Sequence, residues 1–393
     1  MKHFILILII LSSSFLSTTQ AIPAFARKYA MSCQTCHSPF PVLKPYGEEF
    51  AGNGFALPDK DAPRYFVETG DDRLSLLRDL PFAIRLDGAL NYNKADQNKF
   101  DLEAPWILKL LSGGEIAKDI SYYFYFFFSE RGEVAGVEDA FIMFNDLFGI
   151  DLDLAVGQFQ VSDPLFKREL RVTLEDYEVY KPKVGLSNIN LTYDRGFMLS
   201  LGLETGTDIV LAVVNGNGIG GANSMRLYDN DGKKAGLLRL SQEITDFLRI
   251  GAFGYYGTED QSNAFAGTVE NKPLMYGPDL TLTVNDQIAV NAQFIIRKDD
   301  NLLLTPFSVA PSKDYTTKGA MAEVLWTPQG DKSTHYTAFV FNWIESDQKN
   351  LDTKSFGLHT GYMLRRNIRL FGELQYDLIR EYPQFSFGFS SAF

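Results

Sequence analysis

Cysteine and histidine are scarce in this chain of 393 residues, which has only two cysteines and four histidines. These numbers are too small for a metal-dependent hydrolase, and they leave no spare thiol for nucleophilic catalysis. Long hydrophobic runs are also missing, because the apolar run at residues 4–11 is shorter than the ~20 residues of a membrane-spanning helix. With 37 basic and 49 acidic residues, the chain has a formal net charge of −12, which argues against a nucleic-acid partner.

The N-terminus has the three parts of a secretory signal peptide. Lys2 precedes the apolar run, a stretch rich in Ser and Thr follows it, and the small residue Ala21 offers a cleavage site. A membrane-anchoring helix is the alternative, but the run is too short for one. We therefore predict that residues 1–21 are removed on export.

Both cysteines lie in one pentapeptide, Cys33-Gln34-Thr35-Cys36-His37. Two thiols at this spacing can form thioethers to the two vinyl groups of a haem, and the adjacent histidine can ligate the iron. A short disulfide loop would leave His37 without a role, and a thioredoxin-like pair would need a βαβ context that is missing here. The motif predicts one covalent haem c bound by Cys33, Cys36 and His37.

From residue 81 onward, apolar and polar residues alternate with the two-residue period of β-strands. The polar face carries charges and amides, which suit a wet interior better than a packed core, so the pattern favours a transmembrane β-barrel over a soluble β-sandwich. Counting the alternating segments gives about sixteen antiparallel strands, an even number as in bacterial barrels. Three segments show the alternation: 84–93, 288–297 and 368–377.

Loop lengths and the C-terminus also favour the barrel. Short turns such as 285–286 and 365–367 alternate with long polar loops around 162–186, 216–233 and 299–316. The chain ends in an alternating aromatic strand whose last residue is Phe393, which resembles the C-terminal signal of bacterial outer-membrane barrels. The segment 122–128 is aromatic on both faces, so we expect it to contact either the aromatic girdle of the barrel or something apolar inside.

Residues 22–80 do not alternate, and they contain the haem motif together with several prolines and glycines. About sixty residues is little for an independent hydrophobic core, so a covalent haem would supply apolar mass. We predict a small c-type cytochrome domain here, lying at the periplasmic mouth of the barrel or plugging it, and a barrel at 81–393.

These N-terminal motifs resemble one known family. The run AIPAFAR at 21–27, the haem motif, Pro41-x-Leu43 and Tyr46-Gly47-x-x-Phe50 are similar to the fused outer-membrane cytochrome-porins of iron-oxidising bacteria. That resemblance implies one c-type haem joined to a barrel of similar size, which carries electrons inward from extracellular ferrous iron. The barrel part is also similar to phosphate-selective porins.

The sixth ligand of the iron is open, and its identity would tune the redox potential. Only three histidines follow the predicted signal peptide: His37, His335 and His359. In the strand 354–364, His359 and Met363 share the face opposite the apolar one, so both point into the lumen. They are our candidate distal ligands, with ordinary lumen lining as the alternative.

Three functions are compatible with this sequence. The first is an outer-membrane electron conduit between an external redox partner, such as a metal ion, and a periplasmic cytochrome or other carrier. The second is a substrate-selective porin with a haem-bearing plug. The third is a haem enzyme, such as a peroxidase, with an open sixth position.

Overall fold

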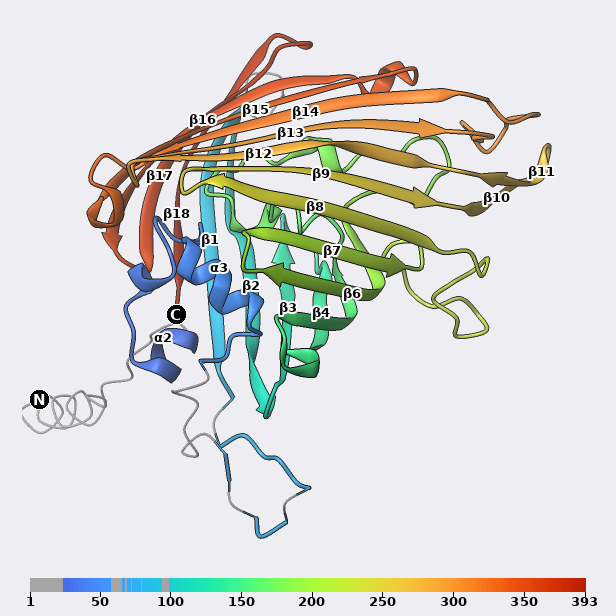
Figure 1. The fold of residues 1–393 in the computed structure, drawn as a ribbon. Coiled ribbons are helices and arrows are strands. Elements are labelled where there is room, and N and C mark those ends of the chain that lie inside the picture. Colours follow the sequence, from blue (N-terminus) through green and yellow to red (C-terminus); the bar gives the residue numbers. More distant parts are fainter. Residues whose placement is uncertain (1–23, 58–65, 68, 72, 79, 94–98) are drawn as a thin grey trace, which may run out of the picture.

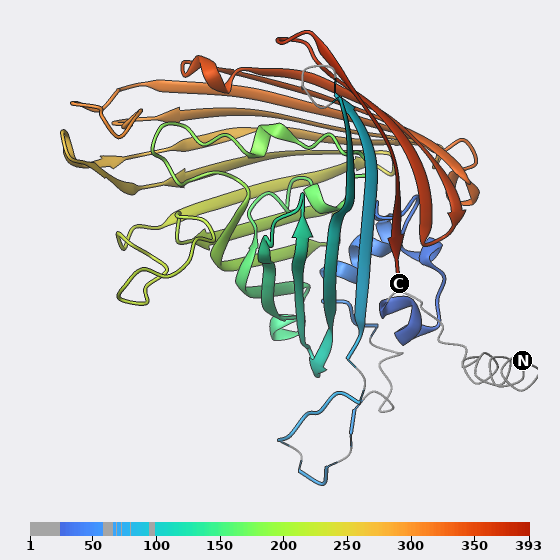
Figure 2. The same ribbon diagram turned by 180° about the vertical axis from the view of Figure 1, so that it is seen from behind.

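The computed structural model describes residues 24–57, 66–67, 69–71, 73–78, 80–93 and 99–393, so the expected signal peptide at 1–21 lies outside the described part. Within that part, sixteen strands form one antiparallel sheet that closes on itself where β1 pairs with β18 (Figures 1 and 2). Neighbours in the sheet are neighbours in sequence, except that the hairpin β10–β11 stands between β9 and β12. The closed sheet confirms the predicted barrel and excludes a β-sandwich, which needs two sheets.

The strand lengths suit a tilted membrane-spanning sheet, which needs about 9–11 residues per strand. The region 186–204 holds a single strand, which settles the uncertain part of the strand count. The strands are β1 Phe82–Asn93, β2 Phe100–Ala117, β3 Ile120–Glu130, β4 Gly136–Phe144, β5 Leu152–Gln160, β6 Tyr193–Leu203, β7 Thr207–Val214, β8 Ala235–Thr245, β9 Leu248–Gly257, β10 Glu259–Asn263, β11 Gly267–Asn271, β12 Leu274–Val284, β13 Ile288–Asp299, β14 Tyr315–Trp326, β15 His335–Ser346, β16 Thr353–Arg365, β17 Ile368–Asp377 and β18 Tyr382–Ala392.

Alternation along the strands separates an apolar outer face from a polar inner face. On β16, Leu358 and Tyr362 are more than 40% exposed, whereas His359 between them is fully buried. On β13, Gln293 and Arg297 are buried inside the barrel, as the sequence pattern predicts. A barrel surface that presents large apolar side chains outward matches the lipid-facing band of outer-membrane barrels.

The two ends of the barrel differ. One end carries short turns, such as the turn after β12, where Asn285 and Asp286 have φ of 51° and 52°, the geometry of tight type I′ hairpins. The other end carries the long loops predicted from the sequence, including 161–192, 215–234 and 300–314. Both the N-terminal helices and the C-terminus lie at the short-turn end (Figure 1).

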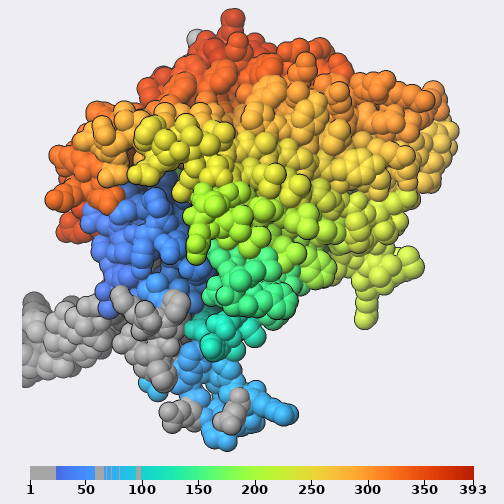
Figure 3. Space-filling view, viewed as in Figure 1, coloured from blue at the N-terminus to red at the C-terminus, as the bar shows by residue number. Residues whose placement is uncertain are grey.

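Residues 24–57 form a small helical unit with an aromatic core. Phe25 stacks on Phe55 with ring centres 4.7 Å apart, and both rings meet Phe50 edge-on. Figure 3 shows this unit in blue, seated against the barrel wall. Its helices are α2 Ala24–Tyr29, the 3-10 turn η1 Cys33–Thr35 and α3 Pro45–Gly52.

Five further 3-10 turns lie in the connections between strands that the structure describes. No helix among the described residues is long and apolar enough to cross a membrane. The turns are η3 Leu147–Gly149, η4 Arg168–Leu170, η5 Glu178–Tyr180, η6 Gly330–Lys332 and η7 Lys349–Leu351.

Candidate functional site

The pentapeptide 33–37 folds into one tight turn that brings its first and last residues together. Ser32 caps η1 through a hydrogen bond from the Gln34 amide, and the His37 amide donates to the Cys33 carbonyl at 2.9 Å. Cys33 and His37 are therefore one helical turn apart. Both cysteines are free thiols that are partly exposed, and burial raises the pKa of each above its usual value. Both thiols are therefore protonated at neutral pH.

A short antiparallel bridge holds the other side of the turn. His37 pairs with Leu43, and the Lys44 amide donates to the Cys36 carbonyl at 2.8 Å. Helix α3 follows and packs so closely that a Cβ on Gly47 would overlap the Cys36 carbonyl. Only glycine permits this approach, which accounts for Gly47 in the motif.

The ring of His37 is oriented by the backbone. Its Nδ1 lies 2.9 Å from the Pro41 carbonyl, an acceptor, so Nδ1 carries the proton and Nε2 carries the lone pair. Burial lowers the pKa of His37 below its usual value, although the carbonyls of Pro41 and Val42 act in the opposite direction. The imidazole is therefore neutral at pH 7. A neutral ring with Nδ1–H bound to a carbonyl is the usual state of a metal-ligating histidine.

The helical unit contacts the inner face of the barrel at two places. On one side, Phe55 stacks on Tyr123 of β3 with ring centres 4.9 Å apart. This contact confirms that the aromatic segment 122–128 meets an apolar partner inside, while its Phe128 is exposed outside. A Cβ on Gly54, where φ is 62°, would overlap the hydroxyl of Ser121, so the two chains approach closely here.

On the opposite side, the haem-motif turn contacts β1 and the turn between β14 and β15. Gln34 and Lys44 both bond to Asp331 in that turn. Phe40 lies 5.9 Å beneath the guanidinium of Arg85 on β1. The segment 33–44 is thus attached to the barrel wall by polar and cation–π contacts.

A cavity of about 230 Å³ lies between this turn and the barrel wall. Of the two candidate distal ligands, Met363 lines it and His359 does not. Arg366 and Tyr336, which the sequence did not single out, line it as well. Its residues are Gln34, His37, Ser38 and Pro39 from the turn, and Thr327, Asp331, Ser333, Tyr336, Met363 and Arg366 from the barrel.

His359 lies inside the barrel, as predicted, but both of its ring nitrogens have partners. Nδ1 is 2.7 Å from the Glu373 carboxylate, and Nε2 is 3.2 Å from the hydroxyl of Tyr336. The ring also stacks between Tyr336 and Phe371. His335, the remaining histidine, is exposed and lies against Tyr362 on the outer face.

The long loop 161–192 folds into the lumen and is held there by side chains of the wall. Glu373 accepts hydrogen bonds from the amides of Leu174 and Glu175 at 2.6 and 2.7 Å. The Arg297 guanidinium donates to the Ile189 carbonyl at 2.6 Å, and the Tyr177 hydroxyl donates to Glu323 at 2.6 Å. The loop is therefore part of the barrel interior rather than a surface segment.

The loop carries its own buried ion cluster. Asp176 pairs with Arg168 at 2.5 Å and with Arg171 and Lys181 at 3.4 Å. Burial acts to raise the pKa of Asp176, but the charges of Arg171 and Arg168 outweigh it and hold the pKa well below its usual range. Asp176 is therefore ionised, and it fixes the shape of the loop.

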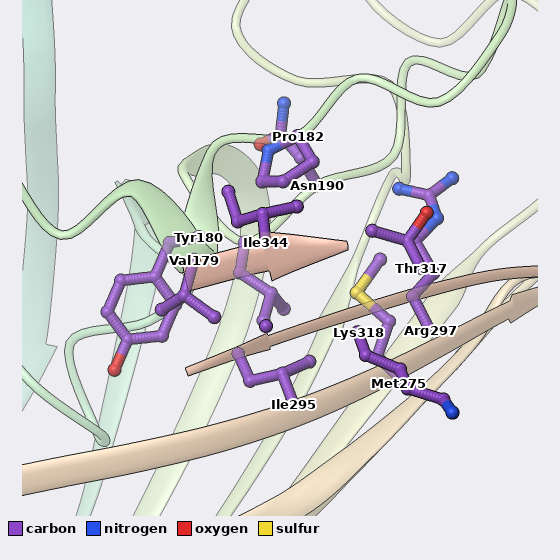
Figure 4. A pocket seen from close by; sticks show the side chains of 12 residues that line it. Val179, Tyr180, Pro182, Asn190, Met275, Ile295, Arg297, Thr317, Lys318 and Ile344 are labelled. Carbon is purple, nitrogen blue, oxygen red and sulfur yellow. The ribbon is translucent and has the colours of Figure 1, made fainter. Parts of the chain in front are cut away.

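Beside the loop lies a second cavity of about 330 Å³ (Figure 4). Val179 and Tyr180 of the loop form one side, and Ile295 and Ile344 of the wall form the other. Among the described residues, no group of three or more His, Cys, Asp or Glu side chains is placed to hold a metal ion. The haem motif requires no such group, because two thiols and one imidazole suffice.

No family model and no curated protein matches the chain. Solved structures do resemble it in fold. An anion-selective porin from Comamonas acidovorans superposes with a TM-score of 0.55 at 11% identity over 80% of this chain and 99% of the porin. OprB from Pseudomonas putida gives 0.55 at 10% identity over 80% and 94%, and OmpT from Vibrio cholerae 0.54 at 10% over 80% and 99%. At such identities the likeness concerns the fold alone: the chain is built as a porin-type barrel.

Proposed function

We propose that this protein transfers electrons across the bacterial outer membrane through one c-type haem attached to Cys33 and Cys36. The observation that carries the proposal is the state of His37: its Nδ1 proton is bound to the Pro41 carbonyl, and its neutral ring offers Nε2 to an iron. The group would supply a reversible one-electron oxidation and reduction there. The residues of the motif turn would hold it, and Pro41 would keep the ring in its ligating tautomer.

The barrel supports the location. Its outer face exposes large apolar side chains, and outer-membrane barrels place their short turns in the periplasm. With that orientation, the haem-motif turn faces the periplasm, where a cytochrome or another soluble carrier can reach it. The long loops face the exterior, where a metal ion such as ferrous iron, or another redox partner, would be the electron donor or acceptor.

The interior of the barrel is consistent with a conduit for electrons rather than for solutes. Inward-facing polar side chains on β15 to β18 would be exposed in a water-filled pore. Instead Asn342, His359 and Ser390 are fully buried. Loop 161–192 covers part of this wall, because its Glu178 amide bonds to Asn342 and its Leu174 and Glu175 amides bond to Glu373.

A substrate-selective porin with the haem unit as a plug is the second candidate, and the likeness to solved porins favours it. In that case the unit at residues 24–57 would have to move away from the barrel mouth to let solutes pass. Its contacts through Phe55 and Asp331 would then be temporary.

One vesicle experiment separates the two candidates. The protein is inserted into lipid vesicles that enclose oxidised soluble cytochrome c, and ferrous citrate is added outside. A conduit reduces the enclosed cytochrome c in the wild type but not in the Cys33→Ser/Cys36→Ser variant. A porin lets ferrous iron enter and gives equal reduction in both, and planar-bilayer conductance then confirms an open pore. Equal reduction would overturn the electron-transfer proposal.

A further inference from the structure

The cavity beside His37 has two walls of different origin. The haem-motif turn supplies His37, and the barrel supplies Met363 from the end of β16 and Arg366 from the following turn. His37, the iron ligand of the proposed function, lines this cavity together with these barrel residues. Any haem attached at residue 33 and residue 36 would therefore border the barrel side chains of this cavity.

Alternation along β16 places Met363 on the same inward face as His359, and the strand becomes irregular just after Met363. The pairing of β16 with β17 shifts register between Met363 and Arg365, which marks a β-bulge. Bulges re-aim side chains and are common beside functional sites. The Met363 amide donates to the Thr334 carbonyl at 2.7 Å, which fixes this part of β16 to the turn that also bears Asp331.

The barrel and the N-terminal unit share one apolar cluster near this cavity. The cluster consists of buried wall and loop residues, with Met363 of the barrel and Val42 of the N-terminal unit packed against it. Val42 is five residues from His37 in sequence and adjoins Pro41, the acceptor of the His37 ring proton. Met363 and His37 thus line one cavity from the barrel and from the N-terminal unit, respectively.

Arg366 faces the same cavity with most of its hydrogen-bonding capacity free. Among the described residues, its guanidinium makes one long hydrogen bond, to the Ser333 carbonyl at 3.4 Å. Its charge also acts on the Cys33 thiol, where it opposes the rise in pKa that burial causes. A guanidinium has five N–H donors and matches carboxylates bidentately, and a haem carries two propionate carboxylates.

The other candidate distal ligand, His359, is hydrogen-bonded to other side chains of the barrel. Its two nitrogens are bound to Glu373 and Tyr336, and its ring is fully buried in an aromatic stack. With Nδ1 bound to Glu373, only Nε2 could bind iron, but Nε2 pairs with the Tyr336 hydroxyl and His359 does not line the cavity beside His37. Among the described residues, the Met363 side chain has no comparable hydrogen bond to break.

We propose that the barrel completes the haem site: the Met363 sulfur is the sixth ligand of the iron, and Arg366 pairs with a haem propionate. The inference rests on the proposed function, and it makes the N-terminal unit and the barrel one redox unit rather than two joined domains. Methionine as the partner of histidine raises the reduction potential of a c-type haem. Ligation by Met363 would also hold the N-terminal unit at the barrel mouth.

The test uses the visible spectrum of the full-length protein purified from membranes. A ferric haem with histidine and methionine ligands is low-spin and shows a sulfur-to-iron charge-transfer band in the near red. We expect this band in the wild type, its loss in Met363→Leu, and carbon monoxide binding to the reduced Met363→Leu variant only. The matched control is Met321→Leu, because Met321 is a buried, inward-facing methionine on β14 that belongs to a different apolar cluster.

Two further variants are needed. Met363→His controls for misfolding, and Arg366→Gln tests the contact of Arg366 with a propionate. Met363→His should stay low-spin, lose the near-red band and lower the midpoint potential. Arg366→Gln should keep the band and lower the midpoint potential, whereas Arg365→Gln, at an exposed neighbour, should leave both unchanged.

The outcomes distinguish the failure of this inference from the failure of the proposed function. A wild type that stains for haem but lacks the band, or a Met363→Leu variant that keeps it, overturns the ligand assignment alone. A potential equally unaffected in Arg366→Gln and Arg365→Gln overturns the propionate contact. Absence of covalent haem from the wild type overturns the proposed function as well.

Discussion

Replacing Glu373 by alanine tests whether the wall of the barrel anchors loop 161–192 in the lumen. The Glu373 carboxylate accepts four hydrogen bonds, from the amides of Leu174 and Glu175, from His359 and from Gln375, at 2.6 to 2.9 Å. All four partners act as donors, which fits an ionised carboxylate, because that form only accepts. Glu373 is itself buried, with 3% of its surface exposed.

The expected cost of the substitution follows from this geometry. Removing one partner of a buried charged network costs about 3–5 kcal/mol, because the remaining donors stay buried without an acceptor. If this free energy acts on the local opening of the loop, the open fraction rises about 100- to 4,000-fold, since each 1.4 kcal/mol is a factor of ten. The control is Glu345→Ala, at an exposed position on β15, where a change of about 0.5 kcal/mol or less is expected.

Trypsin cleavage in vesicles measures the opening. Arg168, Arg171 and Lys181 lie within the loop and become accessible when it leaves the lumen. Cleavage of the Glu373→Ala variant at these sites should exceed that of the wild type and of Glu345→Ala by at least 100-fold. A rate within threefold of both would refute the claim that Glu373 holds the loop.

Three further predictions concern the N-terminal unit and the loop. Gly54→Ala should release the N-terminal unit from the barrel, because φ is 62° at this position and the new Cβ would overlap Ser121. Gly52→Ala is the control, since nothing lies within 4 Å of its Cβ position. The rate of protease cleavage within the unit should rise in the first variant and not in the second. Asp176→Asn should speed trypsin cleavage of the loop near neutral pH. Because the pKa of Asp176 is depressed in the folded state, its stabilising effect is present above the unfolded value of about 3.9 and is lost progressively as pH falls below it. The difference from wild type should therefore shrink in acid, where pepsin replaces trypsin as the probe, and a pH-independent difference would contradict the ion cluster. His37→Ala should retain covalent haem on a denaturing gel but give an altered spectrum, and an unchanged spectrum would exclude His37 as a ligand.

Periodicity predicted the barrel because each strand is exposed to lipid on one side. Leu358 and His359 are adjacent in sequence, and the two-residue period alone places one outside and the other inside. The same two-residue period shows that the segment 122–128 carries aromatic residues on both faces. Its inner partner, Phe55, was not predicted, because contacts between distant segments leave no periodic signal.

The interior could be predicted only in part. The pentapeptide 33–37 predicts a haem site by residue type and spacing, whereas the hydrogen bond between His37 and Pro41 depends on a turn that the sequence does not reveal. Periodicity placed His359 and Met363 on one face but not at a depth. The structure separates them: Met363 borders the cavity at the barrel mouth, and His359 is bound to Glu373. Arg366 escaped notice because it lies in a turn, outside any alternating pattern.

The most direct test of the account is the intact mass of the full-length protein purified from outer membranes. The account predicts the mass of the exported chain plus one haem, with the haem remaining on the peptide that contains Cys33 and Cys36 after proteolysis. A mass equal to that of the polypeptide alone, with both cysteines open to alkylation, would contradict it.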